Sequence, residues 1–82
     1  MMHKAVAREL LRKSGWTEPQ ITMALRIIAH DGARAVTQVA SVLQGFAERC
    51  EEPPEGVAWR ALAARVAADP REAEALWALR AW

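Results

Sequence analysis

The sequence predicts an all-α fold, a compact bundle of about five short helices. Hydrophobic residues make up 52% of the 82 positions, much of this share is Ala, and Tyr is absent. Such a composition favours helices over strands. Apolar residues recur at three-and-four spacing in several segments, and Gly, Pro and short polar residues separate those segments. A chain of this length is one domain whose single core gives roughly 3–5 kcal/mol of net stability, so a partner or a second copy can contribute.

The first helix is predicted over residues 3–14. Its apolar positions share one face, while most of its basic residues lie on the other. These apolar positions are Val6, Ala7, Leu10 and Leu11, and the basic ones are Lys4, Arg8, Arg12 and Lys13. The two basic residues at its end also suit the negative end of the helix dipole.

A glycine and a tryptophan mark the corner between the first and second helices. Gly15 follows a periodic segment and supplies the left-handed residue that ends a helix. Thr17, with Gln20 three residues later, is a capping box that begins the next helix. Trp16 precedes the cap and Ile21 is the fourth helical residue, which is the spacing of a hydrophobic staple.

The second helix is predicted over residues 18–30 and is apolar around most of its girth. One stripe consists of Ile21, Ala24, Leu25 and Ile28, and a second of Met23 and Ile27. We therefore expect it to be the central helix of the bundle.

A third helix is predicted over residues 33–49, after Asp31 and Gly32 interrupt the pattern. Its apolar positions alternate at three and four, which keeps one face towards a neighbouring helix. They are Val36, Val39, Leu43, Phe46 and Cys50. Gly45 lowers its helix propensity by about 1 kcal/mol relative to Ala, or lets another backbone come close.

A Pro- and Glu-rich loop over residues 51–56 divides the chain into parts 1–50 and 57–82. Its paired prolines cannot continue a helix. A fourth helix follows over residues 57–68, with Trp59, Leu62, Ala63 and Val66 on one side. Asp69, Pro70 and Glu72 form another start signal, and the fifth helix runs from Pro70 to the end. The last two helices are expected to form a helical hairpin.

Part of the first fifty residues matches a known pattern. In order, the features are a Gly-aromatic turn, a capped second helix with Ala-Leu in its first half, and a third helix carrying Ala-Val and then an aliphatic residue. They occur here at Gly15-Trp16, Thr17, Gln20, Ala24-Leu25, Arg34-Ala35-Val36 and Val39. Residues 11–39 thus resemble a ubiquitin-associated (UBA) three-helix module. Ser14 replaces a frequent Met, the third helix is longer than usual, and the last two helices are additional.

The resemblance implies a protein-binding role. In such modules the Gly-aromatic loop and the end of the third helix form a shallow apolar patch. That patch binds ubiquitin in eukaryotic members and an elongation factor in a related bacterial exchange factor.

Surplus apolar surface also favours a protein partner, whose identity the sequence does not name. Four tryptophans (Trp16, Trp59, Trp77 and Trp82) are many for so small a domain, although all four could also serve the core. Trp is enriched at interaction hot spots. We predict a small adaptor, regulator or inhibitor that acts without catalysis. Its protein-binding residues are predicted to be Gly15, Trp16, Val39, Leu43 and Trp82.

No motif indicates an enzyme, a cofactor or a metal site. Cys50 continues the apolar seam of the third helix, and neither His3 nor His30 stands at a motif spacing from it. The acidic residues around the Pro-rich loop are typical of a solvated surface rather than a metal site. The single cysteine excludes an internal disulfide and fits a reducing compartment.

Two alternatives to an adaptor follow from the sequence. Residues 62–76 can be threaded on a DNA-binding helix-turn-helix, but Glu72 and Glu74 would then face phosphates. The basic face of the first helix is the better support for nucleic acid. Self-association through the third or fifth helix, giving a homodimer or a structural subunit, is the other alternative.

Bulk properties bound the location and the partners. The formal net charge of +1 is too small to imply nucleic acid or an anionic membrane by itself. The longest apolar run is far short of a membrane span, and no signal-peptide core follows the N-terminus. We expect a soluble, cytoplasmic protein with no membrane partner.

Overall fold

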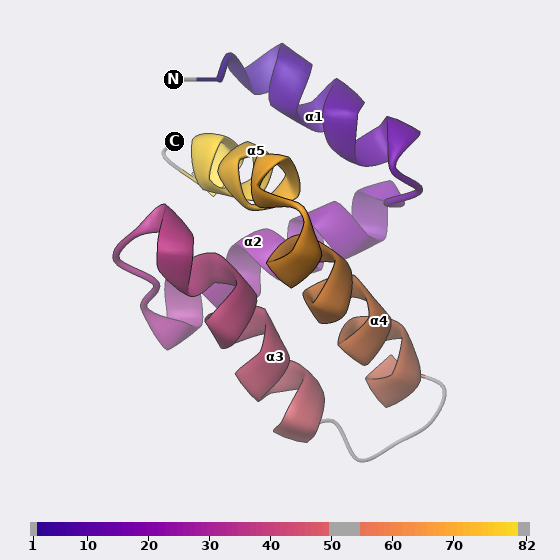
Figure 1. The fold of residues 1–82 in the computed structure, drawn as a ribbon, viewed down its shortest axis with the longest axis vertical. Coiled ribbons are helices and arrows are strands. Elements are labelled where there is room, and N and C mark those ends of the chain that lie inside the picture. Colours follow the sequence, from indigo (N-terminus) through magenta and orange to yellow (C-terminus); the bar gives the residue numbers. More distant parts are fainter. Residues whose placement is uncertain (1, 50–54, 81–82) are drawn as a thin grey trace.

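The computed structural model describes residues 2–49 and 55–80, and all regular structure in them is helical. The elements are α1 (Lys4–Lys13), α2 (Glu18–Asp31), the short 3₁₀ helix η1 (Val36–Gln38), α3 (Val39–Arg49), α4 (Glu55–Ala68) and α5 (Pro70–Arg80) (Figure 1). The predicted all-α bundle of five α-helices is confirmed in this part of the chain.

The first corner forms as its residue types dictate. Gly15 has a φ of +100°, and the backbone N–H of Trp16 donates to the carbonyl of Leu11 at 3.0 Å. This is a Schellman motif, which closes α1. The predicted capping box is present in both halves, because Thr17 and Gln20 exchange side-chain and backbone hydrogen bonds.

The third helix begins later than its periodicity predicts. Gly32, at a φ of +76°, ends α2, and Ala35 is extended, with φ −150° and ψ 156°. One 3₁₀ turn then leads into α3 at Val39, so residues 33–35 are not helical. The side chain of Gln38 accepts a hydrogen bond from the N–H of Arg34 at 2.7 Å and so stabilises this connection. The predicted seam residue Cys50 lies outside the described residues.

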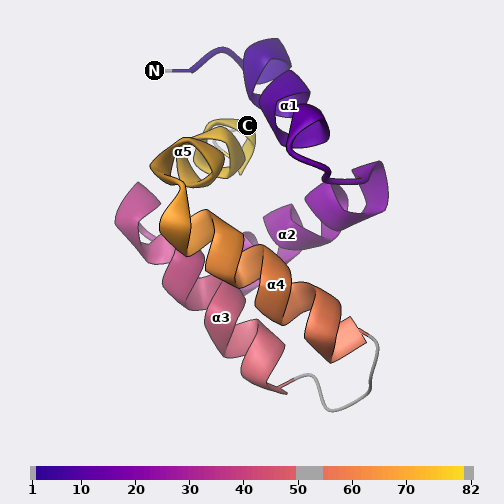
Figure 2. The ribbon, with the colours of Figure 1, turned by 45° about the vertical axis from the view of Figure 1, so that its right-hand side comes forward.

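The helices pair differently from their order along the chain. α3 and α4 lie side by side and antiparallel, and they make the most extensive helix pair (Figures 1 and 2). Only Asp69 separates α4 from α5, which turns away from α4 to pack mainly against α1 (Figure 2). The hairpin is thus α3–α4, whereas α4 and α5 meet at a sharp corner.

The central helix is α5 and not α2. α5 contacts every other α-helix, and six of its eleven residues are buried. They are Glu72, Ala73, Ala75, Leu76, Ala78 and Leu79. Three small alanines let neighbouring helices approach on several sides, whereas α2 leaves Met23 41% exposed.

Candidate functional site

The residues predicted to contact a partner lie mostly in the interior. Trp16 is 3% exposed, and Val39 and Leu43 are fully buried in the same core cluster. Gly15 is exposed but acts as the left-handed residue of the corner. Trp82 lies outside the described residues. The structure therefore places three of the five residues in the core, where a partner cannot touch them in this conformation.

Trp16 is held under α4 and α5 by a polar network. Its indole Nε1 donates to Glu72 Oε1 at 2.7 Å, and Glu72 is only 4% exposed. Arg65 of α4 forms an ion pair with the same carboxylate at 3.3 Å and donates to the carbonyl of Ser14. A buried indole N–H needs such an acceptor, and a buried carboxylate needs such donors. We call these residues (Ser14, Gly15, Trp16, Arg65 and Glu72) the Trp16 corner.

Glu72, part of the start signal predicted for the fifth helix, turns its carboxylate away from the start of α5. Asp69 does cap the helix, because its Oδ1 accepts from the N–H of Arg71 at 3.0 Å. The carboxylate of Glu72 points instead to Trp16 and Arg65. Its burial joins two corners of the molecule that are more than fifty residues apart along the chain.

An aromatic series leads from the Trp16 corner through Trp59 of α4 to Phe46 of α3. Trp16 meets Trp59 edge-to-face, with ring centroids 6.5 Å apart, and Trp59 meets Phe46 at 5.6 Å. Trp59 is buried, while Phe46 is half-buried. Phe46 is therefore the point at which this series reaches the surface.

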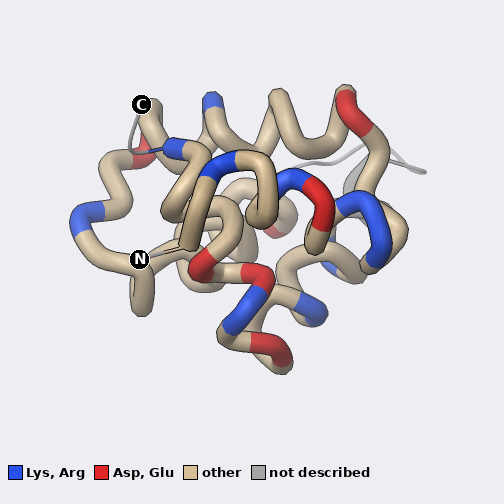
Figure 3. Tube along the Cα trace, turned by 90° about the horizontal axis from the view of Figure 1, so that it is seen from above, with Lys and Arg blue, Asp and Glu red and all other residues tan. Residues whose placement is uncertain are grey.

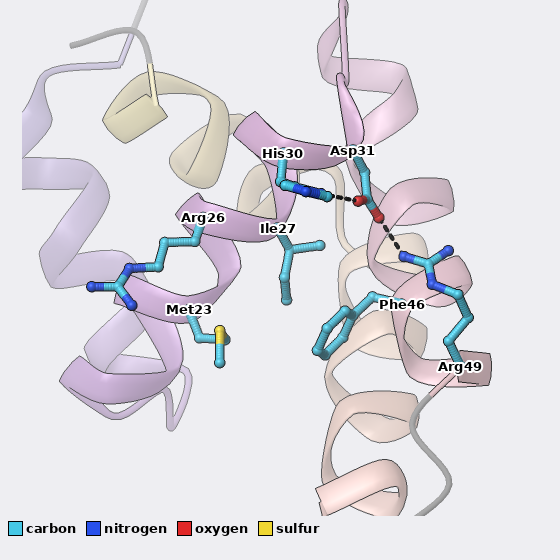
Figure 4. A pocket seen from close by; sticks show the side chains of 7 residues that line it. All are labelled: Met23, Arg26, Ile27, His30, Asp31, Phe46 and Arg49. Atoms are coloured by element: carbon cyan, nitrogen blue, oxygen red, sulfur yellow. Dashed lines mark hydrogen bonds and ion pairs between the residues drawn. The ribbon is translucent and has the colours of Figure 1, made fainter.

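At that point an open groove lies between α2 and α3. It has a volume of about 360 Å³, and its lining residues are Met23, Arg26, Ile27, His30, Asp31, Phe46 and Arg49. Figure 4 shows Met23, Ile27 and Phe46 around a common space between the two helices, while the side chain of Arg26 extends outwards from α2, away from Phe46. We call this the α2–α3 groove.

The upper end of the α2–α3 groove is closed by a chain of polar contacts. Asp31 Oδ1 pairs with His30 Nδ1 at 3.0 Å, and Asp31 Oδ2 pairs with Arg49 Nη2 at 2.6 Å (Figure 4). The hydrogen bond from His30, and then that from Arg49, lowers the pKa of Asp31 from its ordinary value of 3.8. Both carboxylate oxygens are engaged, whereas the side chain of Arg49 is still 62% exposed.

A second apolar surface lies where η1 meets the corner of α4 and α5. Two adjoining hollows there share Val36 and Glu74, and Trp77 lines one of them. Trp77 is half-buried, and the guanidinium carbon of Arg80 lies 4.3 Å from its ring centroid. The lining of this surface mixes alanines (Ala40, Ala67, Ala73 and Ala78) with larger apolar side chains (Met2, Val36, Val66 and Trp77).

The basic face of α1 is partly neutralised. Arg8 and Arg12 both pair with Glu18 of α2, the second at 3.1 Å. In Figure 3, Lys and Arg positions alternate with Asp and Glu positions rather than covering one side. The would-be recognition helix α5 is largely buried. These features give little room for phosphate contacts.

The described residues were also compared with the requirements of a metal site and of a membrane span. No three His, Cys, Asp or Glu side chains gather there in a way that would hold a metal ion. His3 Nδ1 caps α1 by accepting from the N–H of Ala5. None of the helices in the described ranges is long and apolar enough to cross a membrane.

Sequence reasoning missed the α2–α3 groove, although a signal for it was present. The second stripe on α2, Met23 and Ile27, is the wall of the groove. Comparison with protein-family models, with curated proteins and with solved structures found no match for this chain. The candidate site therefore depends on its geometry alone.

Proposed function

We propose that this protein is a small, non-catalytic protein-binding module that uses the α2–α3 groove to act as an adaptor, regulator or inhibitor. The observation that carries the proposal is the exposure of Met23 beside Ile27 and Phe46, in a fold that leaves few large apolar side chains exposed. Only two large hydrophobic residues of the described chain are exposed, Met23 and Val6. Met23 alone of the two lies in a hollow with an aromatic neighbour.

The chemistry of this groove suits a protein partner. Methionine and phenylalanine provide adaptable apolar contacts, and arginine at the rim is a residue enriched at interfaces. The resemblance of residues 11–39 to UBA modules supports the same class of function. Its predicted patch around Trp16 remains a prediction, and it would require α4 and α5 to move away.

Affinity capture from the native host with matched variants tests the proposal. Met23→Glu places a charge in the groove, while Val6→Glu makes the same change at the other exposed hydrophobic residue. We expect Met23→Glu to lose partners that wild type and Val6→Glu retain. Retention of every partner by Met23→Glu, with the fold intact by circular dichroism, would contradict the proposal.

Self-association is the second candidate, and the surface around Trp77 favours it. Its lining combines the large ring of Trp77 with small alanines, which leave room for a second helix to approach. Analytical ultracentrifugation of wild type and Trp77→Glu tests this candidate. A concentration-dependent dimer that Trp77→Glu abolishes would support it, and a monomer at high concentration would remove it.

A further inference from the structure

We infer that the occupant of the α2–α3 groove is an acidic amphipathic helix, which inserts one or two large apolar side chains and places carboxylates beside Arg26 and Arg49. This inference depends on the proposed function and names the chemistry of its partner.

The shape favours a helix. Met23 and Ile27 are four residues apart on α2, so their side chains form a row along that helix, and Phe46 faces this row from α3 (Figure 4). An amphipathic helix that lies in a groove between two helices presents apolar side chains at the same three-and-four spacing. Its apolar stripe would lie between Met23 and Ile27 on one side and Phe46 on the other.

The rim gives the occupant its charge. Arg26 is exposed, and no ion pair between it and another described residue is present. Arg49 donates from Nη2 to Asp31, and the other N–H groups of its guanidinium can donate to a second carboxylate. These two cations lie on opposite walls of the groove, one on α2 and one on α3.

The one acidic residue of the lining does not cancel this preference. Asp31 is engaged on one oxygen by His30 and on the other by Arg49. It therefore orients Arg49 at the rim instead of repelling an incoming carboxylate. A lysine-rich helix would meet two arginines, and like charges across an interface are unfavourable.

Selection from a displayed peptide library tests the inference. The probe is a library of helix-forming 16-residue peptides with Leu, Ile, Phe or Met on one face and Glu, Gln or Lys in equal shares at the flanking positions. Peptides are selected on wild-type protein, and those that also bind the Met23→Glu variant are removed. We expect Glu to be enriched over Lys at the flanks, and Glu peptides to bind about three- to tenfold more tightly than Gln versions.

A charge reversal sharpens the test. Arg26→Glu should weaken the selected Glu peptides and improve their Lys versions. Arg60→Glu is the matched control, since Arg60 is exposed on α4, does not line the groove and gives the same change in net charge. Both variants alter exposed side chains, and circular dichroism verifies their fold.

Each other outcome overturns the inference. Groove-dependent peptides with no preference for Glu, or with a preference for Lys, would overturn the acidic occupant and leave protein binding at the groove intact. An empty selection would overturn it as well, and the capture experiment with Met23→Glu would then decide the proposed function by itself. Duplex DNA that binds at low salt and is released by Arg26→Glu would assign the rim to nucleic acid instead.

Discussion

Just before α2 the chain buries a tryptophan under two other helices, and about two turns further along it leaves a methionine 41% exposed. The Trp16 corner has an acceptor for its indole, a cation for its carboxylate and a left-handed glycine that fixes the chain direction. The α2–α3 groove is open and apolar between Met23, Ile27 and Phe46, and two arginines, Arg26 and Arg49, are among its lining residues. The two regions are joined by the contacts of Trp59 with Trp16 and Phe46.

This difference shows that large apolar side chains in one small domain can have different roles. A tryptophan with a satisfied N–H and a buried face contributes to the fold. A half-buried phenylalanine beside an exposed methionine has contact surface left over. The same helix can therefore serve the core with one stripe and a partner with the next.

Replacing Trp16 is the most severe way to break the corner. Trp16→Ala removes a side chain that is 3% exposed, and such changes cost about 3–5 kcal/mol. Because a domain of this size holds roughly that much net stability, we expect the variant to be largely unfolded at 37 °C. Met23→Ala, in the groove, should change stability by no more than about 0.5 kcal/mol. Urea unfolding followed by circular dichroism compares them, and equal losses would contradict the distinction.

Removing the carboxylate of the Trp16 corner has the next largest effect. Glu72→Leu leaves the indole N–H and the guanidinium of Arg65 without their acceptor, which we expect to cost about 1–3 kcal/mol. Glu74→Leu is the control, because Glu74 is exposed two residues further along the same helix. Thermal unfolding of both variants measures the difference. A Glu72→Leu variant as stable as Glu74→Leu would show that the network does not hold the corner.

The local structure could be predicted from the sequence because its causes are local. The glycine that closes α1, the capping box of α2 and the start of α5 at Pro70 depend on neighbouring residues only. The start of α3 was predicted too early, since Ala33, Arg34 and Ala35 are compatible with a helix and only the turn at Gly32 directs them elsewhere. The apolar period continues through η1 and conceals the break.

The packing of the helices could not be predicted, because an alanine is compatible with both buried and exposed faces of a helix. α5 owes its central place to Ala73, Ala75 and Ala78, which would also fit an exposed helix. The hydrogen bond between Trp16 and Glu72 joins residues far apart in the sequence, and no sequence spacing predicts it. The burial of Trp16 could not be predicted for the same reason: it is decided by α4 and α5, which the pattern of residues 11–39 does not contain.

Replacing two glycines by alanine should change the stability of the protein in opposite directions. Gly15→Ala forces a side chain into a φ of +100°, which we expect to cost about 1–2 kcal/mol. Gly45 is helical, and an added Cβ would meet only the end of the Arg49 side chain at 3.7 Å. Gly45→Ala should therefore stabilise the protein by about 0.4–1 kcal/mol. Melting temperatures of both variants test this, and a loss at position 45 would indicate a close contact in the groove helix.

The smallest effect on stability is expected for Asp31, the carboxylate in the lining of the α2–α3 groove that pairs with His30 and Arg49. Asp31 is stabilised as a carboxylate by His30 and Arg49, so its pKa in the folded chain lies below 3.8. A lowered pKa adds stability that is fully present well above pH 3.8 and is lost as the pH falls through the folded pKa. Asp31→Asn lacks this contribution at every pH. We therefore expect its melting temperature to lie slightly below that of wild type at pH 7 and the two to converge on acidification. If the melting temperatures of wild type and Asp31→Asn differed by the same amount down to pH 2, the charge of Asp31 would not contribute to stability. Arg49 would then not be held in place by the ion pair with Asp31.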